Sequence, residues 1–290
     1  VLEAVDRALA ARLRAAVKRP AWAPHGGQQP PDGDWRVWMI LAGRGFGKTR
    51  AGAEWVIRQA RETARLRVAL VGATIDEVGK VMVRGPSGLM AVSEPEEVLW
   101  YPSRRLAELP NDGVAFAYSG EKPDMLRGPE HHCGWVDELA KYALPEEVWD
   151  NLMLGLRLGP SPRVLVTTTP RPIGLVKRLA ADPAVRVAGG ATGDNPHLPA
   201  AFVADVTARY AGTRLGRQEL LGEIVEDVEG ALWTRALVER CRVSPCPPLQ
   251  GEAASRSDDG GVSTFVARPD RGYPTTPAFG GGPPPLEGED

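Results

Sequence analysis

The sequence lacks the features of a membrane-spanning or secreted protein. No apolar run reaches the ~18 residues that a bilayer-spanning helix needs. The N-terminus carries acids early, where a signal peptide would have its apolar stretch. Only three cysteines occur in 290 residues, without paired spacing, which argues against both a disulfide framework and a zinc site. We therefore expect a cytoplasmic protein with no membrane partner.

The chain also lacks an excess of charge of either sign. Lys and Arg number 35 and Asp and Glu number 37, so the net charge is −2. A nearly neutral chain has no global field that attracts nucleic acid, so any contact with DNA has to come from a local basic patch. The composition, 43% hydrophobic and 25% charged, is ordinary for a globular protein.

Short apolar runs alternate with helical stretches through the middle of the chain. A helix is predicted over residues 49–64, after the first of these runs. Strands alternating with helices predict an α/β fold with a doubly wound, mostly parallel sheet, in which ligands bind beyond the carboxyl ends of the strands. The predicted strands cover residues 35–41, 67–71, 113–118, 133–136, 163–166 and 185–188.

The ends of the chain differ in character from this core. Residues 1–20 have helical periodicity and run into a Pro/Gly-rich loop, and residues 196–240 have helical periodicity again. Beyond them the chain holds nine Pro and eight Gly with few large apolar side chains, so we predict disorder there. The predicted segments are an N-terminal helix and linker (1–34), a core (35–194), a helical subdomain (195–240) and a tail (241–290).

A glycine-rich turn follows the first predicted strand. Glycines at every second position of residues 43–47 let backbone N–H groups enclose an anion, and the following helix directs its positive end at the same point. Lys48 is placed to reach the β- and γ-phosphates, and Thr49 to hold Mg²⁺. The strict P-loop pattern has glycine where this chain has Ala42, but the flanking strand and helix supply its context. We predict a site for ATP and Mg²⁺ formed by Ala42, Gly43, Gly45, Phe46, Gly47, Lys48 and Thr49.

Two adjacent acids end a later predicted strand. Asp137 and Glu138 follow residues 133–136 directly. ATP hydrolysis needs one carboxylate on the metal and a second that is free to polarise the attacking water. Two acids after an apolar run are also a common helix start. Their position after a phosphate-binding loop is what favours a hydrolytic site.

Two further features have two interpretations each. Thr167, Thr168 and Thr169 end the next strand, where hydroxyls can sense the γ-phosphate, although such residues also cap helices. Arg44 lies inside the glycine-rich turn. It is either a solvated loop arginine or a charge that reaches the γ-phosphate and stabilises the transition state. Spacing alone favours the helix cap for the threonines and leaves both interpretations of Arg44 open.

This ordered set of residues resembles the large terminase subunit of tailed phages and gene transfer agents, the ATP-driven motor that packs DNA into procapsids. The resemblance implies a P-loop NTPase fold in which Asp137 completes the Mg²⁺ site and Glu138 is the catalytic carboxylate. The motifs that carry it lie within residues 22–242, at residues 41–55, 81–88, 126–128, 135–138, 167–172 and 212–233.

The resemblance also implies roles that the residues alone do not. Thr167 to Thr169 resemble the motif that couples hydrolysis to movement, and Arg44 matches the arginine of the family's phosphate-binding loop. Arg127, otherwise a turn arginine, is similar in placement to an arginine that acts on a neighbouring subunit's ATP. Residues 195–235 resemble a lid. The implied partners are double-stranded DNA, the portal protein, the small terminase subunit and further copies in a ring.

The sequence departs from the family after Val243. A nuclease domain normally follows there, and its first strand ending in Asp does not appear. We therefore expect ATP hydrolysis that powers translocation of double-stranded DNA into a phage-like procapsid, without DNA cleavage. Mn²⁺-dependent plasmid cleavage by the purified chain, abolished by an acidic-residue mutation within it, would contradict this.

Two alternatives remain open. A helicase-like nucleic-acid translocase needs a second motor domain, which the low-complexity tail does not supply. A vestigial nucleotide-binding module that docks on the portal or small terminase subunit would bind nucleotide without turnover. Measuring turnover separates this module from the two motors.

Overall fold

The computed structural model describes residues 22–225 and 240–241. The chain divides into two units after Val238, and the account below concerns the described part of the first unit. The predicted helix over residues 1–20, the predicted helical residues 226–239 and the predicted tail beyond residue 241 lie outside the described residues. Within those residues, no helix has the length and apolar character that crossing a membrane requires.

A single eight-stranded sheet forms the centre of the unit, with the strand order β3-β4-β5-β2-β6-β7-β1-β8. Six strands run parallel and correspond to the six predicted ones, so the prediction of a doubly wound, mostly parallel sheet is confirmed. The parallel strands are β1 (Val37–Ala42), β2 (Arg67–Gly72), β5 (Gly113–Ser119), β6 (Cys133–Asp137), β7 (Arg163–Thr168) and β8 (Val185–Gly190).

Two strands at one edge were not predicted. β3 (Leu99–Tyr101) and β4 (Leu106–Leu109) pair antiparallel with each other, and β4 pairs antiparallel with β5. They are three and four residues long and are separated by a 3₁₀ turn at Pro102–Arg104. Runs this short carry too little periodicity to be recognised without their pairing partner.

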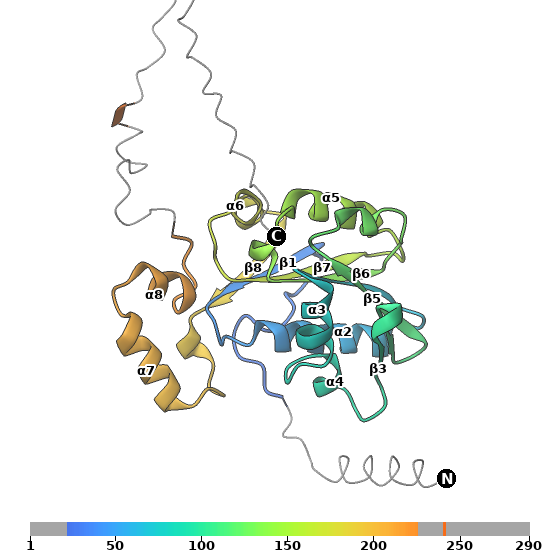
Figure 1. Ribbon diagram of the computed structural model, residues 1–290, viewed down its shortest axis with the longest axis horizontal. Coiled ribbons are helices and arrows are strands. Elements are labelled where there is room, and N and C mark those ends of the chain that lie inside the picture. The colour runs from blue at the N-terminus through green and yellow to red at the C-terminus, as the bar shows by residue number, and fades with distance from the viewer. Residues whose placement is uncertain (1–21, 226–239, 242–290) are drawn as a thin grey trace, which may run out of the picture. The chain divides into compact units, whose positions relative to one another are not determined.

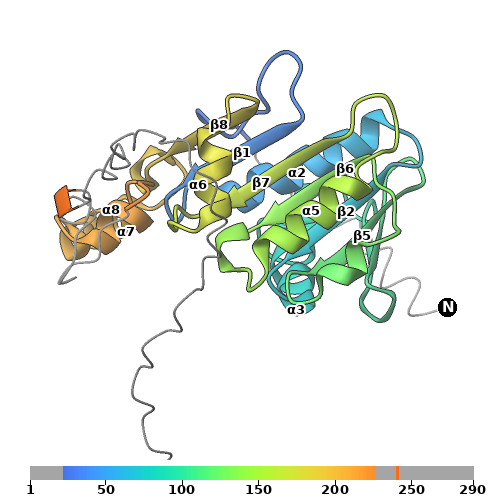
Figure 2. The ribbon, with the colours of Figure 1, turned by 90° about the horizontal axis from the view of Figure 1, so that it is seen from above.

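Helices cover both faces of the sheet (Figure 1; Figure 2). Figure 1 shows α2, α3 and α4 on one face and α5 and α6 on the other. The first face carries α2 (Lys48–Glu62), α3 (Ile75–Glu77), a π-helix (Val78–Val83) and α4 (Leu89–Val92), and the second carries α5 (Pro145–Gly155) and α6 (Gly174–Ala181). Further 3₁₀ turns span Pro123–Leu126, Leu139–Lys141 and Thr192–Asp194.

Two apolar cores lie on the two faces of the sheet because successive side chains of a strand point to opposite sides. In β1, Trp38 and Ile40 belong to the core that includes Trp55 of α2. Met39 of the same strand belongs to the core that includes Leu152 of α5. Burial on both faces explains why the strands read as continuous apolar runs.

The predicted helical subdomain contains two short helices, α7 (Ala200–Tyr210) and α8 (Arg214–Glu219). Gly212 separates them with a left-handed backbone (φ 71°), which interrupts the expected continuous helix. No helix covers residues 220–225, so the helical prediction was too long there. α7 buries none of its side chains within the described unit.

Strand order places three segments side by side at one end of the sheet. β7 lies between β6 and β1, with Thr167 level with Ile40 on one side and Asp137 on the other. Because the strands are parallel, the residues after β1, β6 and β7 leave the sheet at the same edge. The phosphate-binding turn, the acid pair and the threonines therefore meet there.

Candidate nucleotide-binding site

The glycine-rich turn connects β1 to α2. Gly45 and Gly47 have left-handed backbones (φ 81° and 94°), which glycine adopts without strain. α2 begins at Lys48, so Lys48 and Thr49 occupy its first turn, whose N–H groups have no partner within the helix. The turn thus has the backbone geometry that anion binding requires.

Lys48 spans the inside of the turn. Its Nζ donates hydrogen bonds to the carbonyl oxygens of Ala42 (2.9 Å) and Gly43 (3.0 Å). Burial lowers the pKa of Lys48, and the nearby charges of Glu138 and Asp137 act in the opposite direction. The ammonium group is therefore held in place before any ligand binds.

The segment before β1 supports the turn from one side. The carbonyl of Phe46 accepts hydrogen bonds from Gln28 Nε2 (2.8 Å) and from His25 Nε2 (2.9 Å). The Phe46 ring is fully buried. Neither His25 nor Gln28 was singled out in the sequence, because polar residues in a Pro/Gly-rich loop have no local pattern that marks them.

Residues from the end of the predicted core and from the helical subdomain support the turn from another side. Asn195 Nδ2 donates to the carbonyl of Gly45 (2.6 Å), and Thr192 Oγ1 donates to the carbonyl of Arg44 (2.6 Å). The Arg44 N–H donates to the carbonyl of Glu219 (2.6 Å), and Arg44 Nε lies 3.5 Å from Glu219 Oε2. The Arg44 side chain is nevertheless 73% exposed, so its role at the γ-phosphate stays a prediction.

The acid pair lies at the tip of β6. Asp137 is buried, and Thr167 Oγ1 donates to its Oδ1 (2.5 Å). Burial raises the pKa of Asp137 to about 7, and the hydrogen bond from Thr167 lowers it in part. Glu138 has a left-handed backbone (φ 53°). Such strain in a non-glycine residue is typical of functional sites.

The threonines join β7 to this acid pair. Thr168 Oγ1 accepts the N–H of Ala140 (3.1 Å), and Thr169 Oγ1 donates to Glu138 Oε2 (3.3 Å). α6 begins only at Gly174, with Ile173 as its cap. The interpretation of the threonines as a helix cap is therefore wrong, and their hydroxyls connect the tips of β6 and β7.

A cavity of about 470 Å³ lies against the glycine-rich turn, and most of these groups line it. Asp137 is not in its lining, because it is buried next to Thr167. Eight lining residues were not assigned to the site in the sequence: Arg50, Val81, Pro86, Ser87, Lys141, Arg171, Asn195 and Leu198. The predicted residues in its lining are Arg44, Gly45, Gly47, Lys48, Thr49, Glu138 and Thr169.

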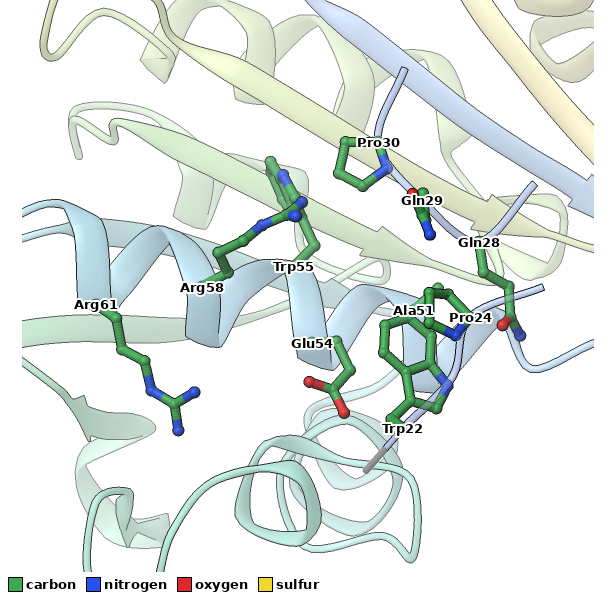
Figure 3. Close-up of a pocket in the computed structure, with 10 residues that line it drawn as sticks. All are labelled: Trp22, Pro24, Gln28, Gln29, Pro30, Ala51, Glu54, Trp55, Arg58 and Arg61. Atoms are coloured by element: carbon green, nitrogen blue, oxygen red, sulfur yellow. The ribbon is translucent and has the colours of Figure 1, made fainter. Parts of the chain in front are cut away.

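Two smaller cavities adjoin the segment before β1. One of about 280 Å³ shares Gly47 and Ser87 with the main cavity and is also lined by Trp22 and His197. The other, of about 370 Å³, lies along α2 (Figure 3). Figure 3 shows Trp22 and the residues around Gln28 facing this helix. None of the residues predicted to bind nucleotide lines the second of these cavities.

Arg127 lies apart from the main cavity. Its side chain is exposed, 3.4 Å from Asp124 Oδ1 and 3.4 Å from Asn151 Oδ1. It follows the 3₁₀ turn Pro123–Leu126 and does not line the cavity. The structure of one chain does not test a role on a neighbouring subunit, so that role stays a prediction.

The histidines next to Cys133 have structural partners. His131 Nε2 lies 3.0 Å from the Tyr118 hydroxyl, and the Arg67 N–H donates to His132 Nδ1 (3.0 Å). Burial raises the pKa of Cys133 to about 12 and lowers that of His131 to about 4. Among residues 22–225 and 240–241, no three His, Cys, Asp or Glu residues are grouped to hold a metal ion.

A mostly parallel sheet with a glycine-rich turn between β1 and α2 and acids at a nearby strand tip defines a P-loop NTPase fold. Solved structures share it. The large terminase of the thermophilic bacteriophage D6E matches with a TM-score of 0.58 and 14% identity over 70% of this chain and 54% of that one. The ATPase domain of the Thermus phage P74-26 large terminase matches with a TM-score of 0.53 and 17% identity, over 70% and 95%.

The family follows from the sequence profile described as "Terminase large subunit, T4likevirus-type, N-terminal", which matches residues 39–240. The chain belongs to this terminase family. It spans about half the length of the D6E large terminase. No curated protein matches the sequence.

Proposed function

We propose that this chain binds ATP with Mg²⁺ and hydrolyses it. The observation that carries the proposal is that Lys48, Glu138 and Thr169 line a single cavity against the glycine-rich turn. These groups come from the ends of three parallel strands, so only the folded sheet assembles them. The D6E large terminase, which shares the fold, has been solved in complex with ADP and with ATP-γ-S.

The residues present fit a magnesium ion. Mg²⁺ prefers oxygen ligands, and Thr49 supplies a hydroxyl and Asp137 a carboxylate. Asp137 is buried with a raised pKa, so a cation beside it would offset the cost of its charge. When bound, Mg²⁺ would neutralise phosphate charge. Asp137 and Thr49 are the residues that we propose hold it.

Glu138 is the proposed general base. Its carboxylate borders the cavity and accepts a hydrogen bond from Thr169, which orients it. It would take a proton from the attacking water while Lys48 and the N–H groups of the turn hold the phosphates. Arg44 is proposed to contact the γ-phosphate, and the segment from Thr167 to Thr169 to transmit loss of that phosphate.

We further propose that this activity drives packaging of double-stranded DNA. Membership of the terminase family supports the motor role, and the portal protein, the small terminase subunit and further copies in a ring are its proposed partners. We keep residues 35–194 as the proposed ATPase core and residues 195–240 as a lid. Contacts of Asn195 and Glu219 with the glycine-rich turn support a lid that responds to nucleotide. The absence of nuclease activity stays a prediction.

The test is replacement of the buried lysine. Lys48→Ala should abolish ATP turnover, because it removes the one side chain whose ammonium group lies inside the turn. Phosphate release by the purified chain measures this. Lys80→Ala is the matched control, since Lys80 is exposed and pairs with Asp76 on the surface.

Three outcomes separate the candidate functions. Turnover that survives Lys48→Ala would refute the assigned site. Nucleotide binding without turnover in the wild-type chain would favour the assembly module. Strand separation coupled to turnover would favour the helicase-like translocase over the packaging motor.

A further inference from the structure

Five cationic side chains line the main cavity, and three of them already have partners. Lys48 donates to two carbonyls of the turn, and Arg44 lies beside Glu219. Arg50 pairs with Glu54 (2.6 Å). The other two, Lys141 and Arg171, are exposed and have no side-chain partner within the described part of the chain. A cavity lined by cations that have no partner is suited to bind an anion.

These two cations border Glu138 from two neighbouring strand tips. Lys141 ends the 3₁₀ turn that follows β6, and its N–H donates to the carbonyl of Glu138 (2.8 Å). Arg171 lies beyond β7, and its N–H donates to the carbonyl of Thr169 (2.8 Å). The Thr169 hydroxyl in turn donates to the Glu138 carboxylate. Backbone hydrogen bonds thus hold both residues next to the proposed general base and its orienting threonine, and both residues line the same cavity as Glu138.

ATP hydrolysis requires positive charge on the side of the cavity that Glu138, Lys141 and Arg171 line. A water activated by Glu138 has to approach the terminal phosphate, and the two anions repel each other. Lys48 and the N–H groups of the turn act from the segment between β1 and α2. After attack, the oxygen–phosphorus bond to the diphosphate breaks and the terminal group leaves as inorganic phosphate. Lys141 and Arg171, which line the same cavity as Glu138, can offset charge there in addition to Arg44 and a magnesium ion.

We infer that Lys141 and Arg171 form a second phosphate-binding pair, which contacts the terminal phosphate of the triphosphate and then inorganic phosphate. This inference rests on the proposed ATPase function. In this inference, Lys141 and Arg171 allow the site to distinguish a triphosphate from a diphosphate. A diphosphate lacks the terminal group that would reach these two side chains. An acidic segment of a second copy is the competing occupant.

The experiment compares two ligands in the presence of Mg²⁺: ADP and a non-hydrolysable ATP analogue. Lys141→Ala and Arg171→Ala should each weaken analogue binding by about tenfold and leave ADP binding within about twofold, because hydrogen bonds to charged groups are worth roughly that much. The double variant should lose most of the preference for the triphosphate. Arg171→Lys should recover part of it, since the charge is kept.

Arg186→Ala is the matched control. Arg186 is an exposed arginine at the start of β8, level with Trp38, and it lines a different cavity at the other end of the strand. It should leave the binding of both ligands unchanged. Thermal melting of each variant checks folding, which exposed side chains should not alter.

Each outcome has a distinct meaning. Equal losses for ADP and the analogue would overturn the inference, since the pair would then not be specific for the terminal phosphate. Unchanged binding by the isolated chain, with loss of turnover only on assembly, would assign the cations to a second copy instead. Failure of the wild-type chain to bind either nucleotide would refute the proposed function itself.

Discussion

Burial shifts the pKa of two side chains at the two ends of β6, and the consequences of the two shifts differ. Asp137 is buried at the tip of β6 beside Thr167, and its pKa is raised to about 7. His131 lies just before the same strand, and burial lowers its pKa to about 4. Asp137 lies where the charges of Glu138 and Lys48 act on it, and it is the carboxylate that we propose binds a cation. His131 packs against Tyr118 and has a structural role.

His131 should make the protein sensitive to acid. The folded state keeps the imidazole neutral down to about pH 4, whereas the unfolded chain takes up a proton near pH 6.5. Stability contributed by the neutral ring is therefore lost as pH falls below 6.5. We expect wild-type stability to drop by about 2 kcal/mol more between pH 7 and pH 5 than that of His131→Phe.

Urea unfolding at several pH values measures this difference. His131→Phe loses the hydrogen bond to Tyr118, so this variant should be less stable than the wild type at neutral pH. Its free energy of unfolding should nevertheless depend less on pH. His197→Gln is the control, because His197 lies on the surface. Parallel pH profiles for the wild type and His131→Phe would show that His131 does not carry the effect.

At the scale of elements, α2 packs directly on β6 through a glycine. A side chain at Gly52 would overlap the indole ring of Trp135. The same indole donates its Nε1–H to Thr167 Oγ1 (3.0 Å), next to Asp137. Close contact between helix and strand therefore extends to the hydrogen bonds at the acid pair.

Gly52→Ala should destabilise the chain although alanine favours a helix. Helix propensity alone would stabilise by about 1 kcal/mol, but overpacking of a dense core typically costs about 1–3 kcal/mol. We expect a net loss of stability together with lower ATP turnover, as Trp135 shifts away from Thr167. Gly26→Ala is the control, because a side chain there meets nothing within 4 Å. A more stable Gly52→Ala variant would contradict the packing argument.

The position of Arg127 bears on how several copies of the whole molecule would act together. The glycine-rich turn and Glu138 line one cavity, and Arg127 lies outside it. An arginine that acts in a neighbouring subunit has to be exposed on its own chain, as Arg127 is. Function in a ring would therefore make each ATP site dependent on two copies.

Arg127→Ala should lower turnover in assembled rings by up to ~10³-fold and leave nucleotide binding by the single chain unchanged. Mixing Arg127→Ala subunits with Lys48→Ala subunits should restore part of the activity, because each supplies what the other lacks. Arg104→Ala, which removes an exposed arginine beside Tyr101, is the control. Rings of Arg127→Ala that are as active as the wild type would remove this role.

Much of the fold and part of the site could be predicted from the sequence because they depend on contiguous residues. Continuous apolar runs identified the six parallel strands, and alternating glycines followed by Lys48 predicted the turn between β1 and α2, whose binding of phosphate stays a prediction. The two antiparallel strands were missed because each is too short to show a period. The helical prediction was wrong between α7 and α8 and over residues 220–225, because the left-handed backbone of Gly212 and the contacts of Glu219 override local periodicity there.

Which distant residues share the cavity was decided only by the tertiary structure. Strand order inserts β7 between β6 and β1, and this order brings Thr169 beside Glu138 and into the same cavity as Lys48. His25, Ser87, Arg171 and Asn195 join the site from four separate loops. Such residues have no local pattern, since their function depends on neighbours far away in the chain. The sequence determined the chemistry of each strand tip, and the packing of the sheet determined which tips act together.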